Sequence, residues 1–147
     1  MNLFIVNQTP VPVPRKYLKT ALTHLVEQPF FNRFKRNKNK NLVLAFLQTN
    51  QARHLNLEFR GKDYATDVLS FSPTEDDDLG ELVFCPDVLK KQSLEHGLSY
   101  RDELIYMVYH GVLHLLGYEH ETNEKDAKKM FAIQDRAFAS FLQRPKI

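Results

Sequence analysis

Apolar and polar residues alternate in blocks along the chain, and each block predicts one element of secondary structure. Short apolar runs predict four strands, at residues 2–7, 41–48, 67–72 and 81–84. Stretches in which apolar residues recur every three or four positions predict five helices, at residues 14–28, 49–60, 86–96, 100–116 and 123–142. This order of elements predicts a single α+β domain over residues 1–147, with a mixed sheet of about four strands packed with about five helices.

Several residues mark where these helices begin and end. Pro14 suits a first helical turn, and Thr49 or Asn50 can cap the second helix, which Gly61 would end with a positive φ. Ser99 is expected to cap the long fourth helix, and Gly117 to end it. The last helix has an apolar stripe that we expect to be buried, made of Ala127, Met130, Phe131, Ile133, Ala137, Phe138 and Phe141.

The composition is that of an ordinary soluble globular protein, with 43% hydrophobic and 26% charged residues. The apolar run at residues 42–47 is far too short to span a membrane, so we expect no membrane partner. The first residues have no basic segment before their short apolar run, unlike a secretory signal. Cys85 is the single cysteine, which excludes an intramolecular disulfide. We therefore expect a cytoplasmic protein.

Charge is unevenly distributed, although the net charge is only +2. The segment NRFKRNKNKN has no acidic residue and carries Arg33, Lys35, Arg36, Lys38 and Lys40. The segment TEDDDLGE, at residues 74–81, carries five acids and no base. Each run taken alone is typical of a solvated loop.

Three of the six histidines lie within the segment YHGVLHLLGYEH. His110 and His114 are four residues apart in a predicted helix, so their rings project from the same face. Gly117 lets the chain turn back, so His120 can reach the same point. Three histidines that hold zinc leave one coordination position open, which is typical of a catalytic site. The sequence thus predicts one zinc ion per chain, on a long central helix. His24, His54 and His96 have no comparable partners and are interpreted as structural.

The same spacing occurs in the metzincin proteases, in which a Glu after the first histidine is the general base. Here that position is Gly111, which cannot accept a proton. The metal ligands of a protease are therefore present without its base.

The segment HGVLHLLGYEH resembles the signature of the YbeY endoribonucleases, in which His-Gly-x-Leu-His-Leu-x-Gly-Tyr-Asp-His supplies three metal ligands. LNLEFRGKDYATDVLSF and LGELVFCPDV resemble two further blocks of that family. Glu81 and Glu119 stand where the family usually has Asp, and neither is a histidine ligand.

The resemblance implies a zinc-dependent endoribonuclease that cleaves single-stranded RNA in the cytoplasm. It also implies a role in the maturation of ribosomal RNA, notably the 3′ end of the small-subunit RNA, and in ribosome quality control. The ribosome or small-subunit proteins are then possible partners. Arg60 matches a functional arginine of the family, and a planar guanidinium can bind two phosphate oxygens at once. We interpret Arg60 as catalytic.

Other residues have weaker assignments. Lys62 is a candidate phosphate contact, as are Arg33, Lys35, Arg36, Lys38 and Lys40, with Phe34 available for base stacking. Asp67 either orients a site residue or caps a strand. Glu103 is interpreted as an ion-pair partner, Cys85 as a small buried residue and Tyr118 as a packing residue.

Three functions remain open on these residues. The first is a metal-dependent endoribonuclease. The second is a zincin-like metalloprotease or amidase, which Gly111 opposes. The third is a non-catalytic ribosome-associated protein stabilised by zinc, which a three-ligand site opposes because structural zinc normally has four protein ligands.

Overall fold

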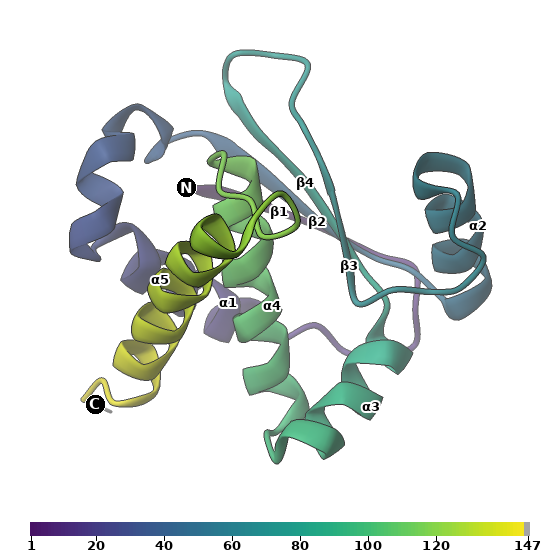
Figure 1. Cartoon of the computed structure of the whole chain (residues 1–147). Helices are drawn as coiled ribbons and strands as arrows, with labels where there is room; N and C mark the ends of the chain where they lie inside the picture. Colours follow the sequence, from purple (N-terminus) through teal and green to yellow (C-terminus); the bar gives the residue numbers. More distant parts are fainter. Residues whose placement is uncertain (146–147) are drawn as a thin grey trace.

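The computed structural model describes residues 1–145 and shows an α+β fold with one four-stranded sheet (Figure 1). The predicted fold class is therefore confirmed. The elements in chain order are β1 (Asn2–Asn7), α1 (Arg15–Val26), the 3₁₀ helix η1 (Pro29–Asn37), β2 (Asn41–Phe46), α2 (Thr49–Arg60), β3 (Val68–Phe71), β4 (Asp78–Phe84), α3 (Pro86–His96), α4 (Tyr100–Leu115) and α5 (Glu124–Leu142). No helix in the described part of the chain is long and apolar enough to cross a membrane.

The sheet is mixed, as predicted, with strand order β1-β2-β4-β3. β1, β2 and β4 run parallel, and β3 pairs with β4 antiparallel. β4 begins at Asp78, three residues before the predicted start, so the end of the acidic run is not a loop. Asn41 at the start of β2 explains this, because its side-chain amide donates to Asp78 Oδ1 at 3.1 Å.

Helices cover both faces of the sheet. α1, α4 and α5 lie together on one face, where Leu42, Leu44 and Phe46 of β2 enter the main core (Figure 1). Leu55 of α2 packs on the other face, over a smaller cluster that includes Ala45 and Val83. α4 is the central helix, as predicted, and its histidine-bearing end lies against β4 of the sheet.

Gly111 is the point at which α4 comes closest to the sheet. A Cβ atom at this position would lie 2.6 Å from a methyl carbon of Leu82 in β4, which is closer than van der Waals contact allows. A side chain here would push the Leu82 side chain aside, so glycine suits this close approach of helix and strand. The residue that takes the place of the metzincin base therefore faces the core.

The basic run is helical rather than a loop, which corrects the prediction. Its segment forms η1, because Phe31 is buried and Phe30 and Phe34 pack edge-on against Tyr118. These aromatic residues recur at helical spacing, a signal that the lysines and arginines between them obscure. The packing role predicted for Tyr118 is confirmed.

Most predicted helix ends are confirmed. The Ser99 hydroxyl accepts from the Asp102 N–H at 3.1 Å, and Gly61 has a φ of 68° after α2. The predicted cap of α2 is wrong: Gln48 is the N-cap, and its N–H donates to the Gln51 side chain at 3.2 Å. Thr49 instead donates its hydroxyl to Asp87 on α3 at 2.7 Å.

The predicted buried stripe of α5 is only partly correct. Met130, Ala137, Phe138 and Phe141 are buried. The prediction is wrong for Phe131, which is 37% exposed, and Ala127 and Ile133 are half-buried. The fully buried position between Met130 and Ala137 is Gln134, whose polar side chain the apolar pattern did not include.

Candidate metal centre

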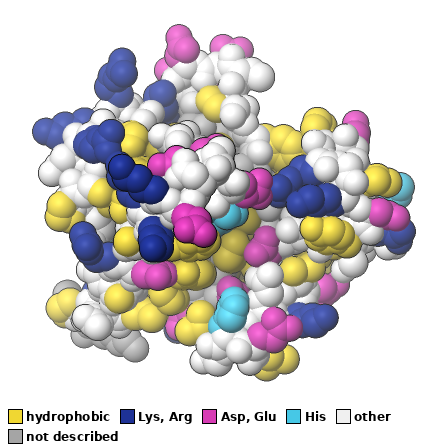
Figure 2. All heavy atoms as spheres, in the orientation of Figure 1, with side chains coloured by type: hydrophobic (Ala, Val, Ile, Leu, Met, Phe, Trp, Pro, Cys, Tyr) yellow, Lys and Arg dark blue, Asp and Glu magenta, His cyan; other side chains and the backbone are white. Residues whose placement is uncertain are grey.

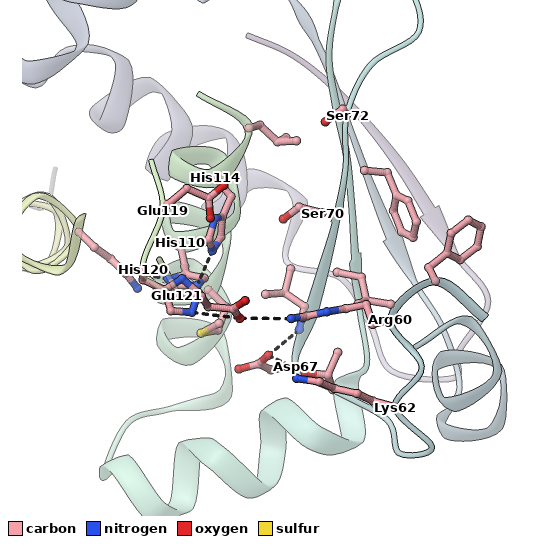
Figure 3. A pocket seen from close by; sticks show the side chains of 18 of the residues that line it. Arg60, Lys62, Asp67, Ser70, Ser72, His110, His114, Glu119, His120 and Glu121 are labelled. Carbon is pink, nitrogen blue, oxygen red and sulfur yellow. Dashed lines mark hydrogen bonds and ion pairs between the residues drawn. The ribbon is translucent and has the colours of Figure 1, made fainter. Parts of the chain in front are cut away.

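The end of α4 and the turn after it bring three histidine rings together. His110 and His114 lie one helical turn apart, with their Nε2 atoms 3.2 Å from each other. Gly117 adopts a φ of 104°, which reverses the chain after α4 and returns His120 to the same point. One nitrogen from each of the three rings lies within 4.8 Å of the other two (Figure 3).

Hydrogen bonds on the far side of two rings fix which nitrogens carry protons. The Gln134 amide donates to the Tyr106 carbonyl at 3.1 Å, so its oxygen faces His110 Nδ1 at 2.9 Å and accepts from it. His114 Nδ1 donates to the Tyr118 carbonyl at 3.1 Å, because a carbonyl only accepts. Both Nε2 atoms of the neutral rings are therefore unprotonated, and their contact is a contact between lone pairs.

This arrangement fits a cation. A tetrahedral zinc ion with Zn–N bonds of about 2.0–2.1 Å holds its ligand nitrogens about 3.4 Å apart, close to the 3.2 Å between His110 and His114. Two lone pairs at this distance repel unless a positive charge lies between them. His120 Nδ1 is also buried, with no hydrogen-bond partner among residues 1–145. The three histidines therefore have the donor chemistry of a metal site.

The protonation state of the rings suits the same role. Burial lowers the pKa of His110 below its ordinary value. Burial also lowers the pKa of His114, and the neighbouring His110 and His120 lower it further. These rings are therefore neutral near pH 7, which is the form that binds a metal ion.

The histidines lie on one wall of a cleft of about 810 Å³, and Arg60 and Lys62 line the same cleft (Figure 3). Arg60 comes from the end of α2, so residues about fifty positions apart in the sequence meet here. Glu121 links the two sides: its Oε1 lies 3.2 Å from Arg60 Nη2 and 3.8 Å from His120 Nε2. The Arg60 guanidinium lowers the pKa of Glu121, so this carboxylate is ionised at neutral pH.

The cleft has more negative than positive side chains. Arg60 and Lys62 are opposed by three carboxylates, those of Asp67, Glu119 and Glu121. A bound divalent cation would reverse this balance and make the cleft attractive to phosphate.

The basic run does not line this cleft. Arg33 and Phe34 line an adjacent hollow of about 270 Å³ with Tyr118 and Glu119, beside the turn that carries His120. Arg36 and Lys40 lie elsewhere, in a hollow shared with the acidic Asp76 and Asp77. Lys35 and Lys38 are exposed and line neither hollow. In Figure 2, Lys and Arg side chains gather on the side of the molecule formed by η1 and α5.

Other residues singled out in the sequence have structural positions. Asp67 lines the cleft and also accepts from the Val68 N–H at 2.8 Å, so it caps β3. Glu103 is fully buried, and its Oε1 lies 2.6 Å from His96 Nδ1, a contact that is an ion pair when the imidazole is protonated. Cys85 is buried, as expected.

Sequence reasoning missed three residues of this site. Gln134 orients His110, Glu121 pairs with Arg60, and Phe131 stacks on the His110 ring with centroids 5.8 Å apart. Gln134 had a usable signal, because it is a polar residue at a core position four residues after Met130. Nothing in the sequence pairs Glu121 with Arg60.

The fold and the site define a class: a single-sheet α+β protein in which a central helix and the following turn present a three-histidine candidate metal centre. The family model described as Endoribonuclease YbeY matches residues 4–142. The chain belongs to the YbeY endoribonuclease family.

Individual relatives agree with this assignment. An Endoribonuclease YbeY from Bdellovibrio bacteriovorus is 49% identical, over 98% of this chain and 97% of the relative. One from Persephonella marina is 35% identical, over 94% of this chain and 92% of the relative. The solution structure of TM1509 from Thermotoga maritima superimposes with a TM-score of 0.64 at 29% identity, and covers 95% of this chain and 88% of that one.

Proposed function

We propose that this protein is a zinc-dependent endoribonuclease that cleaves single-stranded RNA. The observation that carries the proposal is the arrangement of the cleft, in which unprotonated nitrogens of a histidine cluster face Arg60 and Lys62. Membership of a family whose members are named endoribonucleases supports it. The maturation of ribosomal RNA at the small-subunit 3′ end, ribosome quality control and a cytoplasmic location belong to the same proposal.

The residues divide the work in the following way. His110, His114 and His120 would hold one zinc ion, which supplies a Lewis acid and an open coordination position for water when bound. Arg60 binds the oxygens of the scissile phosphate and stabilises the negative charge that develops on them. Lys62, beside it, attracts the RNA backbone.

Glu121 holds Arg60 at the cleft until RNA arrives. The Arg60 and Glu121 side chains are 38% and 61% exposed, and an exposed ion pair contributes at most about 1 kcal/mol. A phosphate group can therefore replace Glu121 at little cost. The guanidinium is then already aimed into the cleft, which lowers the entropy lost on binding.

The peptidase alternative is weaker. Its base would occupy position 111, which is buried and faces Leu82 rather than the cleft. A carboxylate at that point would have to displace the Leu82 side chain and does not start on the cleft side of α4.

The test is RNA cleavage by tag-free protein before chelation, after chelation, and after re-addition of zinc. We expect cleavage of a single-stranded RNA that stops with chelator, returns with zinc, and is much slower on the same RNA annealed to its complement. Undiminished cleavage in chelator would contradict the metal requirement. Equal rates on single and double strands would contradict the substrate assignment.

A further inference from the structure

The cleft has exposed aromatic rings on its rim in addition to its charged groups. Four aromatic side chains in the described part of the chain are exposed, and three of them line this cleft: Phe59, Tyr64 and Phe131. Exposed aromatic rings in one cleft mark a surface that binds another molecule. Phe131 packs on the rings of His110 and His120, so its contacts within the protein account for its position. Phe59 and Tyr64 make no such contact.

Phe59 and Tyr64 belong to the opposite wall and are held in place there. Phe59 precedes Arg60 in the last turn of α2 and is 60% exposed, with one edge against the Phe71 ring at a centroid distance of 5.1 Å. Tyr64 is 54% exposed, and its backbone carbonyl accepts a 2.7 Å hydrogen bond from the buried Asn56 amide. The rings are therefore exposed but set on a fixed backbone.

The loop that carries Tyr64 is fixed at a second point. Asp63, the residue before it, makes two hydrogen bonds to the Arg53 guanidinium, at 2.6 and 2.9 Å. The Tyr64 hydroxyl makes no hydrogen bond to any residue in the range 1–145. Within this range, no hydrogen bond holds the ring in its exposed position. A ring held in solvent without an internal partner is ready to stack on a ligand.

We propose that Phe59 and Tyr64 form a base-stacking wall, which binds unpaired bases next to the phosphate held by Arg60. The proposal deepens the proposed function and rests on it. Aromatic rings stack on any of the bases, so stacking does not depend on sequence. A base must leave its duplex before its face is exposed for stacking. Arg60 lines the same cleft as both rings, so a phosphate bound at Arg60 would bring its adjoining nucleoside toward them. The wall thus makes the site selective for single strands.

The chain has no tryptophan, which allows a direct test of stacking. Tyr64→Trp places the only indole of the protein in the wall. Leu94→Trp is the control, because Leu94 is 84% exposed on α3 and does not line the cleft. The probe is a single-stranded oligoribonucleotide with 2′-O-methyl groups, which bind but cannot supply an attacking hydroxyl. We expect binding to quench the indole of Tyr64→Trp and to leave that of Leu94→Trp unchanged.

An abasic version of the same oligonucleotide separates stacking from proximity. It keeps every phosphate and removes the bases, so it should bind more weakly and cause no quenching at saturation. Equal quenching by both oligonucleotides would overturn the proposal. So would an absence of quenching when fluorescence anisotropy of labelled RNA shows that the complex has formed.

Affinity gives a second, independent measurement. Phe59→Ala and Tyr64→Ala should each weaken single-stranded RNA binding roughly 10-fold, whereas Tyr64→Phe, which keeps the ring, should bind like the wild type. The alanine variants should lose little affinity for the abasic oligonucleotide and for duplex RNA. Equal losses on all three nucleic acids, or unchanged affinity for the single strand, would contradict a stacking wall.

The two proposals fail in different ways. If the wild type cleaves single-stranded RNA but Tyr64→Trp is not quenched, the stacking wall is wrong and the nuclease assignment stands. If the indole is quenched but no metal restores cleavage, the nuclease assignment is wrong and the site is an RNA-binding one. If the wild type binds no RNA at all, both are wrong.

Discussion

At the scale of single residues, the candidate metal centre depends on atoms behind the histidines as much as on the histidines. The Gln134 oxygen and the Tyr118 carbonyl each accept a hydrogen bond from a histidine Nδ1–H, which leaves the two Nε2 atoms free to bind a metal. Such partners set both the tautomer and the orientation of a metal-binding imidazole. The His-x3-His spacing alone would not ensure either.

Arg60 is the residue whose role can be tested most cleanly. Arg60→Ala should keep the full zinc content and nearly the wild-type melting temperature, because the ion pair with Glu121 is exposed and weak. Cleavage of single-stranded RNA should fall about 10²-fold or more, as when one preorganised donor is lost. Arg60→Lys should recover only part of this, because an ammonium group cannot bind two oxygens in a plane.

Arg15 provides the matched control. It is an exposed arginine at the start of α1 and does not line the cleft. Arg15→Ala should therefore cleave RNA like the wild type. If Arg60→Ala does so too, Arg60 has no part in the chemistry.

The residues predicted from sequence are those whose partners are close along the chain. His110, His114 and His120 lie within eleven residues, so helix periodicity and one glycine were enough to bring them together. Glu121 contacts Arg60 across sixty-one positions, and no local pattern encodes that contact. The pairing of distant elements, which only the fold determines, decides which charged residues share the cleft.

At the scale of elements, the packing of α4 on β4 determines which residue can follow the first histidine of the site. The helix lies so close to the strand that a side chain at position 111 would displace the Leu82 side chain. The glycine that looks like a missing base in the sequence is a packing residue in the fold. This meaning of Gly111 was not accessible from the sequence, because the contact with Leu82 is tertiary.

Gly111→Glu should therefore destabilise the protein without creating a peptidase. A carboxylate at this position would be buried against Leu82 without a partner. Burying an unpaired charge costs roughly several kcal/mol of folding stability. Urea unfolding should show a large loss of stability relative to the wild type. Leu94→Glu, which adds the same charge at an exposed helix position, should unfold nearly like the wild type. Wild-type stability, or any peptide cleavage by Gly111→Glu, would contradict this account.

Other elements show why sequence patterns succeeded or failed. α5 was predicted within one residue at each end because Asn123 caps it and its apolar residues recur regularly. η1 was missed because its aromatic residues are embedded in a basic run that dominates the composition. The early start of β4 was missed because pairing with β2 outweighs the low strand propensity of Asp78.

At the scale of the whole molecule, the basic residues lie beside the cleft and not within it. Arg33 is next to the turn that carries His120, whereas Arg36 and Lys40 face acidic residues at the other end of η1. An RNA strand that leaves the cleft past this turn meets Arg33 first. The predicted role of the run in RNA binding remains a prediction.

Salt dependence tests that role. Replacing Arg33, Lys35, Arg36, Lys38 and Lys40 by Gln should flatten the plot of log affinity against log salt by up to ~3 units, if all five contact phosphates. Arg33→Gln alone should account for about 0.7 of a unit, the share of one contact to a single strand. A matched variant with Gln at the exposed Lys16, Lys19, Lys90 and Lys91 should keep the wild-type slope. An unchanged slope in the five-residue variant would show that these side chains are solvated and do not contact RNA phosphates.

The most direct test of the central claim is the zinc content of tag-free protein, measured by mass spectrometry of the metal. We expect about one zinc per chain in the wild type and far less in His114→Ala, because two remaining protein ligands form a much weaker site. His54→Ala, which removes an exposed histidine from α2, should keep the wild-type content. A full equivalent of zinc in His114→Ala, or none in the wild type, would contradict the three-histidine zinc centre.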